Sequence, residues 1–268
     1  MDLHHILGYI LAILVGISLG LIGSGGSILT VPILVYVMAV EPVLATAYSL
    51  FVVGFTALVG GLQSMRSKCV DFKTVLIFGI PSILSVYLTR AFLVPLIPET
   101  LFSLGSFAFT KSIALMVLFA IVMIFASISM IRPSNIKDTT KNQALEYNYP
   151  KILLEGVVVG VLTGLVGAGG GFLIIPALVI LAKMPMKLAV GTSLFIIAAK
   201  SLIGFIGDLQ GDGIIDWQLL STFTALSVAG IFAGIYLSKK IASSKLKSTF
   251  GWFVLVMAIY ILANELFF

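Results

Sequence analysis

The stretches GLIGSGGSILTVP (residues 20–32) and GLVGAGGGFLIIP (residues 164–176) contain the same glycine-rich pattern, and each lies within an apolar segment. The two copies lie 144 residues apart. At that spacing, 12 of the 29 positions from 23 to 51 are identical to their counterparts at 167 to 195. Similarity over this length, in ungapped register, indicates an internal duplication rather than two local accidents.

The composition is that of a membrane protein. Of the 268 residues, 60% are hydrophobic and only 10% are charged, and the mean hydropathy is +1.18. A soluble domain carries about 25% charged residues. The net charge of +5 does not indicate nucleic-acid binding, because the basic residues lie in short loops between apolar runs. The single Cys69 excludes an internal disulfide and a cysteine zinc cluster.

The apolar runs predict the architecture. A helix that crosses the hydrocarbon needs about 20 residues, and runs 28–40 and 172–182 are too short to cross comfortably. Lipid leaves no backbone group unsatisfied, so we expect these runs to be half-helices that meet their neighbours at a glycine break. The predicted fold is an all-α polytopic membrane protein with two repeats, each holding one broken or re-entrant helix pair and three transmembrane helices. The first repeat is residues 1–131, the cytoplasmic linker is 132–151, and the second repeat is 152–268.

Loop charge predicts the orientation of each repeat. The loop 63–73 holds Arg66, Lys68 and Lys73, whereas its counterpart 208–216 holds three aspartates and no base. Because basic loops favour the cytoplasm, the same loop faces inward in one half and outward in the other. We therefore expect inverted-topology repeats in a plasma (inner) membrane, with both termini outside. This design places a substrate site near the bilayer midplane.

The glycine runs are the first candidate binding site. The first amides of a helix have no partner within it and carry partial positive charge. Two such ends that meet from opposite sides would form a small cradle for an anion. Close helix packing is the competing explanation, and spacings such as Gly16/Gly20, Gly160/Gly164 and Gly230/Gly234 predict it elsewhere in the chain. The candidate cradle residues are Gly23, Ser24, Gly25, Gly26 and Ser27, together with Gly167, Gly169, Gly170 and Gly171.

Polar residues on the helix after each glycine run extend the candidate site. Lys200 lies at bilayer depth, where an unpaired charge costs several kcal/mol, so a bound anion is one partner for it and snorkelling to the outer interface is the alternative. Ser49 and Ser193 are a matched pair, and Thr192 stands beside the second. Substrate contact is one role for each of these hydroxyls, and a bond to its own backbone or to a neighbouring helix is the alternative. No catalytic constellation is present, so we expect no enzyme activity, no cofactor and no metal.

The chain resembles the TauE/SafE family of membrane permeases, also described as sulfite exporters. The resemblance rests on both glycine-rich stretches and on AVGTSLFIIAAKSLIGF (189–205) after the second, and it covers nearly the whole chain. It implies a secondary transporter of small anions such as sulfite, sulfoacetate and related organosulfonates, in a prokaryotic plasma membrane. The alternative is a passive anion channel. The oligomeric state is left open, with a homodimer among the options.

Overall fold

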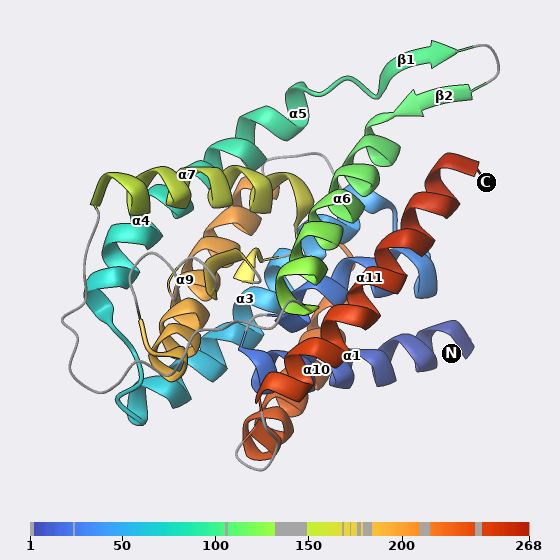
Figure 1. The fold of residues 1–268 in the computed structure, drawn as a ribbon. Coiled ribbons are helices and arrows are strands. Elements are labelled where there is room, and N and C mark those ends of the chain that lie inside the picture. The colour runs from blue at the N-terminus through green and yellow to red at the C-terminus, as the bar shows by residue number, and fades with distance from the viewer. Residues whose placement is uncertain are drawn as a thin grey trace.

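The computed structural model describes residues 3–23, 25–104, 107–131, 149–167, 169–171, 173–175, 178, 184–209, 215–238 and 243–267. Within these ranges the chain is almost entirely helical (Figure 1). Six of the described helices are long and apolar enough to cross a membrane. The predicted all-α polytopic fold is therefore confirmed.

The helices begin and end close to the predicted apolar runs. The first half contains α1 (Leu3–Ile22), η1 (Gly25–Leu29), α2 (Thr30–Pro32), η2 (Ile33–Val37), α3 (Pro42–Arg66), α4 (Phe72–Leu88), η3 (Thr89–Leu93), α5 (Val94–Leu96), β1 (Thr100–Leu104), β2 (Phe107–Thr110) and α6 (Lys111–Ile131). The second half contains α7 (Tyr149–Val166), α9 (Met186–Asp208), α10 (Trp217–Ser238) and α11 (Ser243–Phe267).

The half-helix after the first glycine run is built from three short pieces. It starts as the tight turn η1, continues through α2, and ends in the wider turn η2, where Met38 N donates to Ile33 O at 3.1 Å. Together Gly26–Val37 form an apolar helix that is too short to span a membrane by itself. This agrees with a broken helix in the first half.

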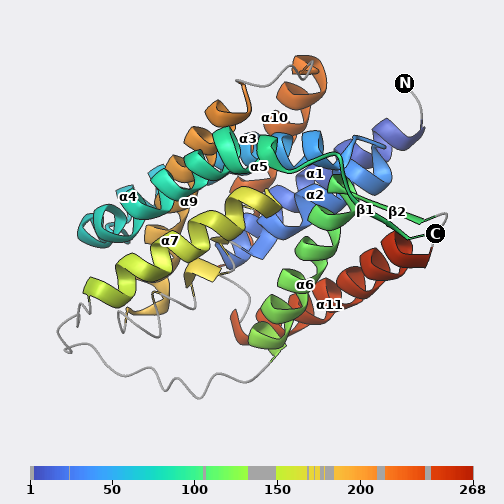
Figure 2. The ribbon, with the colours of Figure 1, turned by 90° about the horizontal axis from the view of Figure 1, so that it is seen from above.

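A β-hairpin joins α5 to α6, where the sequence predicts only a loop. Strands β1 and β2 pair antiparallel, and the rings of Phe102 and Phe109 stack with centroids 4.9 Å apart. The hairpin projects from the helical body (Figure 1). Helix α1 begins and α11 ends on the side of the molecule where the hairpin lies, while α4 begins on the opposite side (Figures 1 and 2).

The main helix pairs all join one half of the chain to the other. Helix α1 packs along α10, and its counterpart α7 packs along α4; α3 packs against α9, and α6 against α11 (Figure 2). Each of these helices thus packs on a helix of the other half, and helices that correspond in the two halves have corresponding partners. A twofold relationship between the halves would produce this pattern. The opposite orientation of the halves in a membrane stays a prediction.

Three clusters of buried side chains follow from this exchange. The first joins α1, η2, α3 and α10, and the second joins α3, α4, α7 and α9. The third joins α6 and α11 to the residues around the first glycine run, including Ile28 and Val31, and to Val166 at the end of α7. The glycine runs therefore lie where the exchanged helices meet.

Glycines make the exchanged pairs close, as the sequence predicts. A Cβ built on Gly20 of α1 would lie 2.5 Å from the carbonyl oxygen of Ile231, and one on Gly160 of α7 would lie 2.6 Å from the carbonyl oxygen of Ser82. A Cβ on Gly230 would overlap the carbonyl of Ile13. Since backbone carbonyls cannot rotate away, these positions admit only glycine at this helix separation.

We expect Gly230→Ala to lower the midpoint of thermal unfolding in detergent, because overpacking costs about 1–3 kcal/mol. Gly79→Ala is the matched control, since a Cβ there would lie 4.0 Å from Ile196 Cγ1, an ordinary van der Waals contact. Alanine in a helix interior is favoured over glycine by about 1 kcal/mol, so Gly79→Ala should not lower the midpoint. Equal midpoints for the two variants would contradict the close packing of α1 on α10.

Candidate functional site

The two glycine runs end their preceding helices in the same way. Gly23 and Gly167 are in the left-handed region, with φ of 81° and 73°. Their amides donate to the carbonyls four residues back, those of Leu19 and Thr163, at 2.8 Å each. This is the αL cap that a glycine provides at the end of a helix. The first glycine of each run is therefore needed for the backbone, whatever else the run does.

Each capping glycine also packs against the opposite half of the chain. A Cβ on Gly23 would overlap Val190 of α9, and one on Gly167 would overlap Thr46 of α3. Val190 and Thr46 are themselves counterparts at the spacing of 144 residues. Close packing, the competing explanation in the sequence, thus accounts for these two glycines.

The second run starts its half-helix at Gly170. The carbonyl oxygen of Gly170 accepts bonds from the amides of Leu173 and Ile174, at 3.1 and 3.2 Å. Gly169 and Gly170 both have positive φ, 65° and 61°, so the chain reverses here in a conformation that other residues resist. Gly170 stands at the N-cap, so the amide of Gly171 has no carbonyl acceptor within the helix. Ser24 and Ala168 lie outside the described residues.

The two runs meet at Gly169. A Cβ built on this residue would lie 2.6 Å from Val53 Cγ1 of α3, 3.5 Å from Ile197 Cγ2 of α9, and 3.5 Å from Ser27 Cβ of the first run. Val53 and Ile197 are counterparts in the two halves. Gly169 therefore lies at the point where α3, α9 and both glycine runs converge. Ser27 is completely buried there.

Helices α3 and α9 present matched faces to this point. Ser49 precedes Val53 by four residues, and Ser193 precedes Ile197 by four, so each serine lies one turn away on the same face. The Ser193 hydroxyl donates to Val190 O at 2.8 Å. The Ser49 hydroxyl is buried and has no partner among the described residues. Of the matched pair, Ser49 is thus the one with an unused hydroxyl.

Lys200 lies beside the second run, inside the protein. Its side chain is completely buried, and its Nζ donates to Thr163 Oγ1 of α7 at 3.0 Å. A Cβ built on Gly170 would lie 2.7 Å from Nζ. The ammonium group is therefore not extended toward an interface, as a snorkelling lysine would be. In the part of the chain that the structure describes, no carboxylate pairs with it.

Thr192 lies at another place. Its hydroxyl accepts a bond from the amide of Asp71 at 2.9 Å, and Asp71 caps the start of α4. The counterpart arrangement is present in the other half, where the Tyr48 hydroxyl accepts from the amide of Asp216. These bonds tie α9 to α4 and α3 to α10. Substrate contact by Thr192 stays a prediction.

The sequence analysis missed two polar residues near the glycine runs, Thr163 and Arg90, and it recognised a third, Thr30, as a hydroxyl donor of the first run without placing it in the candidate site. Thr163 supplies the partner of Lys200, and its position four residues before Gly167 gave no signal of that role. Thr30 is completely buried in α2, and its hydroxyl has no partner among the described residues. Arg90 was counted among loop charges, but the helix continues through η3 to Leu96 and buries the arginine to 1% exposure. Its place inside the apolar run 72–97 was the available signal.

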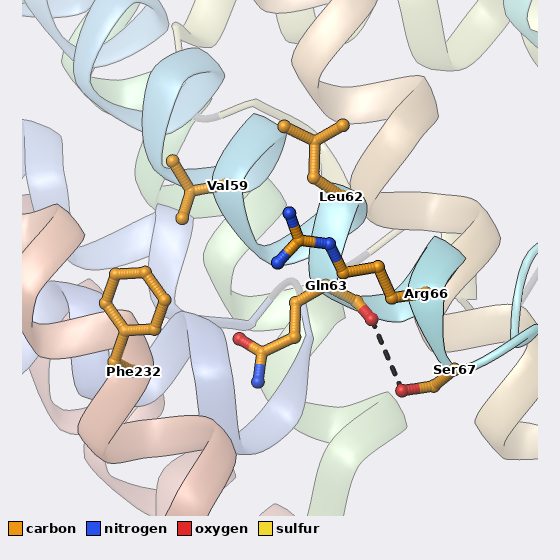
Figure 3. Close-up of a pocket in the computed structure, with 6 residues that line it drawn as sticks. All are labelled: Val59, Leu62, Gln63, Arg66, Ser67 and Phe232. Carbon is orange, nitrogen blue, oxygen red and sulfur yellow. Dashed lines mark hydrogen bonds between the residues drawn. The ribbon is translucent and has the colours of Figure 1, made fainter.

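A cleft of about 510 Å³ opens on the side of α3, next to α10 (Figure 3). Leu62 and Phe232, which face it, are 43% and 52% exposed, so the cleft opens on the outer apolar surface. The predicted site residues do not line it. The cleft is lined by Val59, Leu62, Gln63, Arg66, Ser67 and Phe232.

A multi-pass helical bundle in which two glycine-rich breaks meet inside the protein is typical of membrane transporters. Residues 8–261 match the family model described as Sulfite exporter TauE/SafE. The chain belongs to the sulfite exporter TauE/SafE family, and it is a multi-pass membrane transporter.

Curated relatives carry transporter names. A probable membrane transporter protein of Xylella fastidiosa (strain 9a5c) is 29% identical over 253 residues, which cover 93% of this chain and 91% of the relative. The probable membrane transporter protein YunE of Bacillus subtilis (strain 168) is 34% identical over 234 residues, covering 78% and 79%. No solved structure matches the chain.

Proposed function

We propose that this protein is a secondary transporter of small sulfur oxyanions, and that the anion binds where the two glycine runs meet. The observation that carries the proposal is the position of Lys200 Nζ at Gly170, one residue from the Gly169–Ser27 contact. A buried ammonium group, helix-start amides and hydroxyls on α2 and α3 provide hydrogen-bond donors and no competing carboxylate among the described residues.

Typical free energies indicate how much each kind of donor would contribute to anion binding. A helix N-terminus stabilises a nearby anion by about 0.3–1 kcal/mol at exposed sites, and by up to about 2 kcal/mol in partly buried ones. A hydrogen bond to a charged group contributes about 1.5–3 kcal/mol. Lys200 should therefore supply the larger part of the affinity, while the glycine runs set the shape of the site. Thr163 positions the lysine.

The close contacts at Gly169 favour a small substrate. Val53, Ile197 and Ser27 all approach this residue, so little room is left for a carbon chain beyond the anionic group. Sulfite fits this restriction better than longer organosulfonates. The family to which the chain belongs is described as sulfite exporters, which supports the same choice.

The proposed transport cycle is alternating access around this fixed site. Because the main helix pairs join the two halves, each moving body contains helices from both repeats. We infer inverted repeats with both termini outside, in the plasma membrane. The hairpin side, where α1 begins and α11 ends, would then face outward, and the basic turn before α4 would face the cytoplasm (Figure 1).

The alternative is a passive anion channel. Proteoliposomes with purified protein distinguish the two, because an exchanger gives saturable sulfite uptake that internal unlabelled sulfite stimulates. A channel gives ohmic current without counterflow. We expect counterflow-stimulated uptake. A single-channel current without counterflow would favour the channel.

Sulfite should stabilise the purified protein. A ligand that binds only the folded state at 100 times its Kd adds about 2.7 kcal/mol, so we expect a concentration-dependent rise of several degrees in the unfolding midpoint. Sulfate, phosphate, sulfoacetate and chloride complete the panel. A panel in which sulfite and the other oxyanions leave the midpoint unchanged would argue against the proposed site.

A further inference from the structure

A second buried cation, Arg90, lies near the start of the second glycine run. Its Nη1 donates to Thr46 Oγ1 at 3.0 Å, and Thr46 is the residue against which Gly167 packs. The neighbouring Thr89 approaches Gly164, where a built Cβ would lie 2.7 Å from Thr89 Cβ. Arg90 is therefore one side chain away from the run.

The ion pair that holds Arg90 is incomplete. Nη1 lies 3.3 Å from Asp208 Oδ1 at the end of α9, and it is the same nitrogen that binds Thr46. Within the described residues, Arg90 Nε and Nη2 have no acceptor, and Asp208 Oδ2 has no donor. Buried polar groups are normally hydrogen-bonded, because a buried group without a partner loses its hydration and gains no hydrogen bond in return.

The unused nitrogens form one edge of the guanidinium group. Nε and Nη2 point their N–H bonds in parallel, which is the fork that takes two oxygens of a carboxylate or another oxyanion. Asp208 uses none of this edge. A water molecule could accept one of these bonds, but two parallel donors match an oxyanion.

We propose that Arg90 is a second anion-binding site, and that Asp208, which uses other N–H donors, competes with the transported anion for the positive charge of the guanidinium group. This inference rests on the proposed function and adds a residue outside the Lys200 site. The anion would bind the Nε–Nη2 edge as Asp208 lets go of Nη1, before or after it occupies the glycine runs. In this part of the chain the two repeats align at a spacing of 145 residues, as Asp71 and Asp216 show. At that spacing the counterpart of Arg90 is Ile235, which is apolar, so the second repeat has no equivalent cation. The site therefore serves one side of the membrane only.

The test uses the full chain in proteoliposomes, with radiolabelled sulfite as the probe. Asp208→Asn should lower the apparent KM for sulfite by about tenfold, because it removes the competing charge; Arg90→Lys keeps the charge but loses the fork and should raise the KM by about tenfold. In the double variant, Asp208→Asn should give no gain. Arg66→Lys makes the same exchange at an exposed arginine at the end of α3 and is the matched control, which should leave the KM unchanged.

A second readout is the sulfite-induced shift of the unfolding midpoint, which needs no transport. It should grow in Asp208→Asn and shrink in Arg90→Lys. Unchanged KM and shift in both folded variants, beside a wild type that responds to sulfite, would overturn the role of Arg90 and leave the proposed function standing. An equal effect of Asp208→Asn on the KM in the wild type and in the Arg90→Lys variant would also overturn the role of Arg90 and leave the proposed function standing. A wild type with neither sulfite flux nor shift would overturn both proposals.

Discussion

Gly169→Ala is expected to reduce sulfite flux by about a hundredfold or more while the protein still inserts and remains folded, since displacement of a binding group by about 1 Å can cost this much. Two effects add at this position. The backbone φ of 65° is strained for a residue with a Cβ, and the new methyl group would lie 2.6 Å from Val53 Cγ1. The run must then move away from α3, and the contact with Ser27 is lost.

Gly79→Ala provides the matched control for Gly169→Ala, because it makes the same chemical change in a helix with room for a methyl group. Flux in proteoliposomes is compared after both variants have passed size-exclusion chromatography. Wild-type flux in a folded Gly169→Ala protein would mean that the meeting of the two runs does not shape the site. The binding proposal would then be abandoned.

Lys200→Met should weaken the apparent affinity for sulfite by about tenfold to a hundredfold, the equivalent of one hydrogen bond to a charged group. The same substitution removes a buried charge that has no carboxylate partner among the described residues. The unfolding midpoint without sulfite should therefore rise or stay constant, while the shift induced by a given sulfite concentration becomes smaller. A purely structural lysine would show the reverse, a lower midpoint with unchanged affinity.

Lys111→Met is the control for Lys200→Met. Lys111 is also a buried lysine, with 7% exposure, but it begins α6 beside the hairpin. Its replacement should leave the apparent affinity for sulfite unchanged. Equal losses of affinity in the two variants would indicate a general effect of buried charge and remove Lys200 from the site.

Much of the fold could be predicted because lipid leaves few options for an apolar run. Run length and glycine breaks were enough for α1, the short Gly26–Val37 helix and the long helices after them. The hairpin was missed because its strands belong to a segment that was treated only as a loop between crossings. The alternating phenylalanines in TLFSLGSFAFT (100–110) were available as a strand signal.

The candidate site was only partly predictable. The duplication pointed to Gly169, and a charge at bilayer depth pointed to Lys200; the structure places the two beside one another through Gly170. It could not show that Thr192 accepts a bond from Asp71, because a repeat aligns residues without identifying their partners. Arg90 was missed since it was counted with the charges of the following loop, although it lies inside the apolar run 72–97. The helix instead continues and buries it.

The exchange of partners between the halves bears on how the chain is made. When the ribosome has released residues 1–131, α1 and α4 stand in the bilayer without α10 and α7, the helices against which they will pack. The first half must persist as separate helices until the second has been inserted, and assembly is thus a late event. A chain cut within residues 132–148 would yield two fragments that need each other, so co-expression of both should restore the transporter where either fragment alone is degraded.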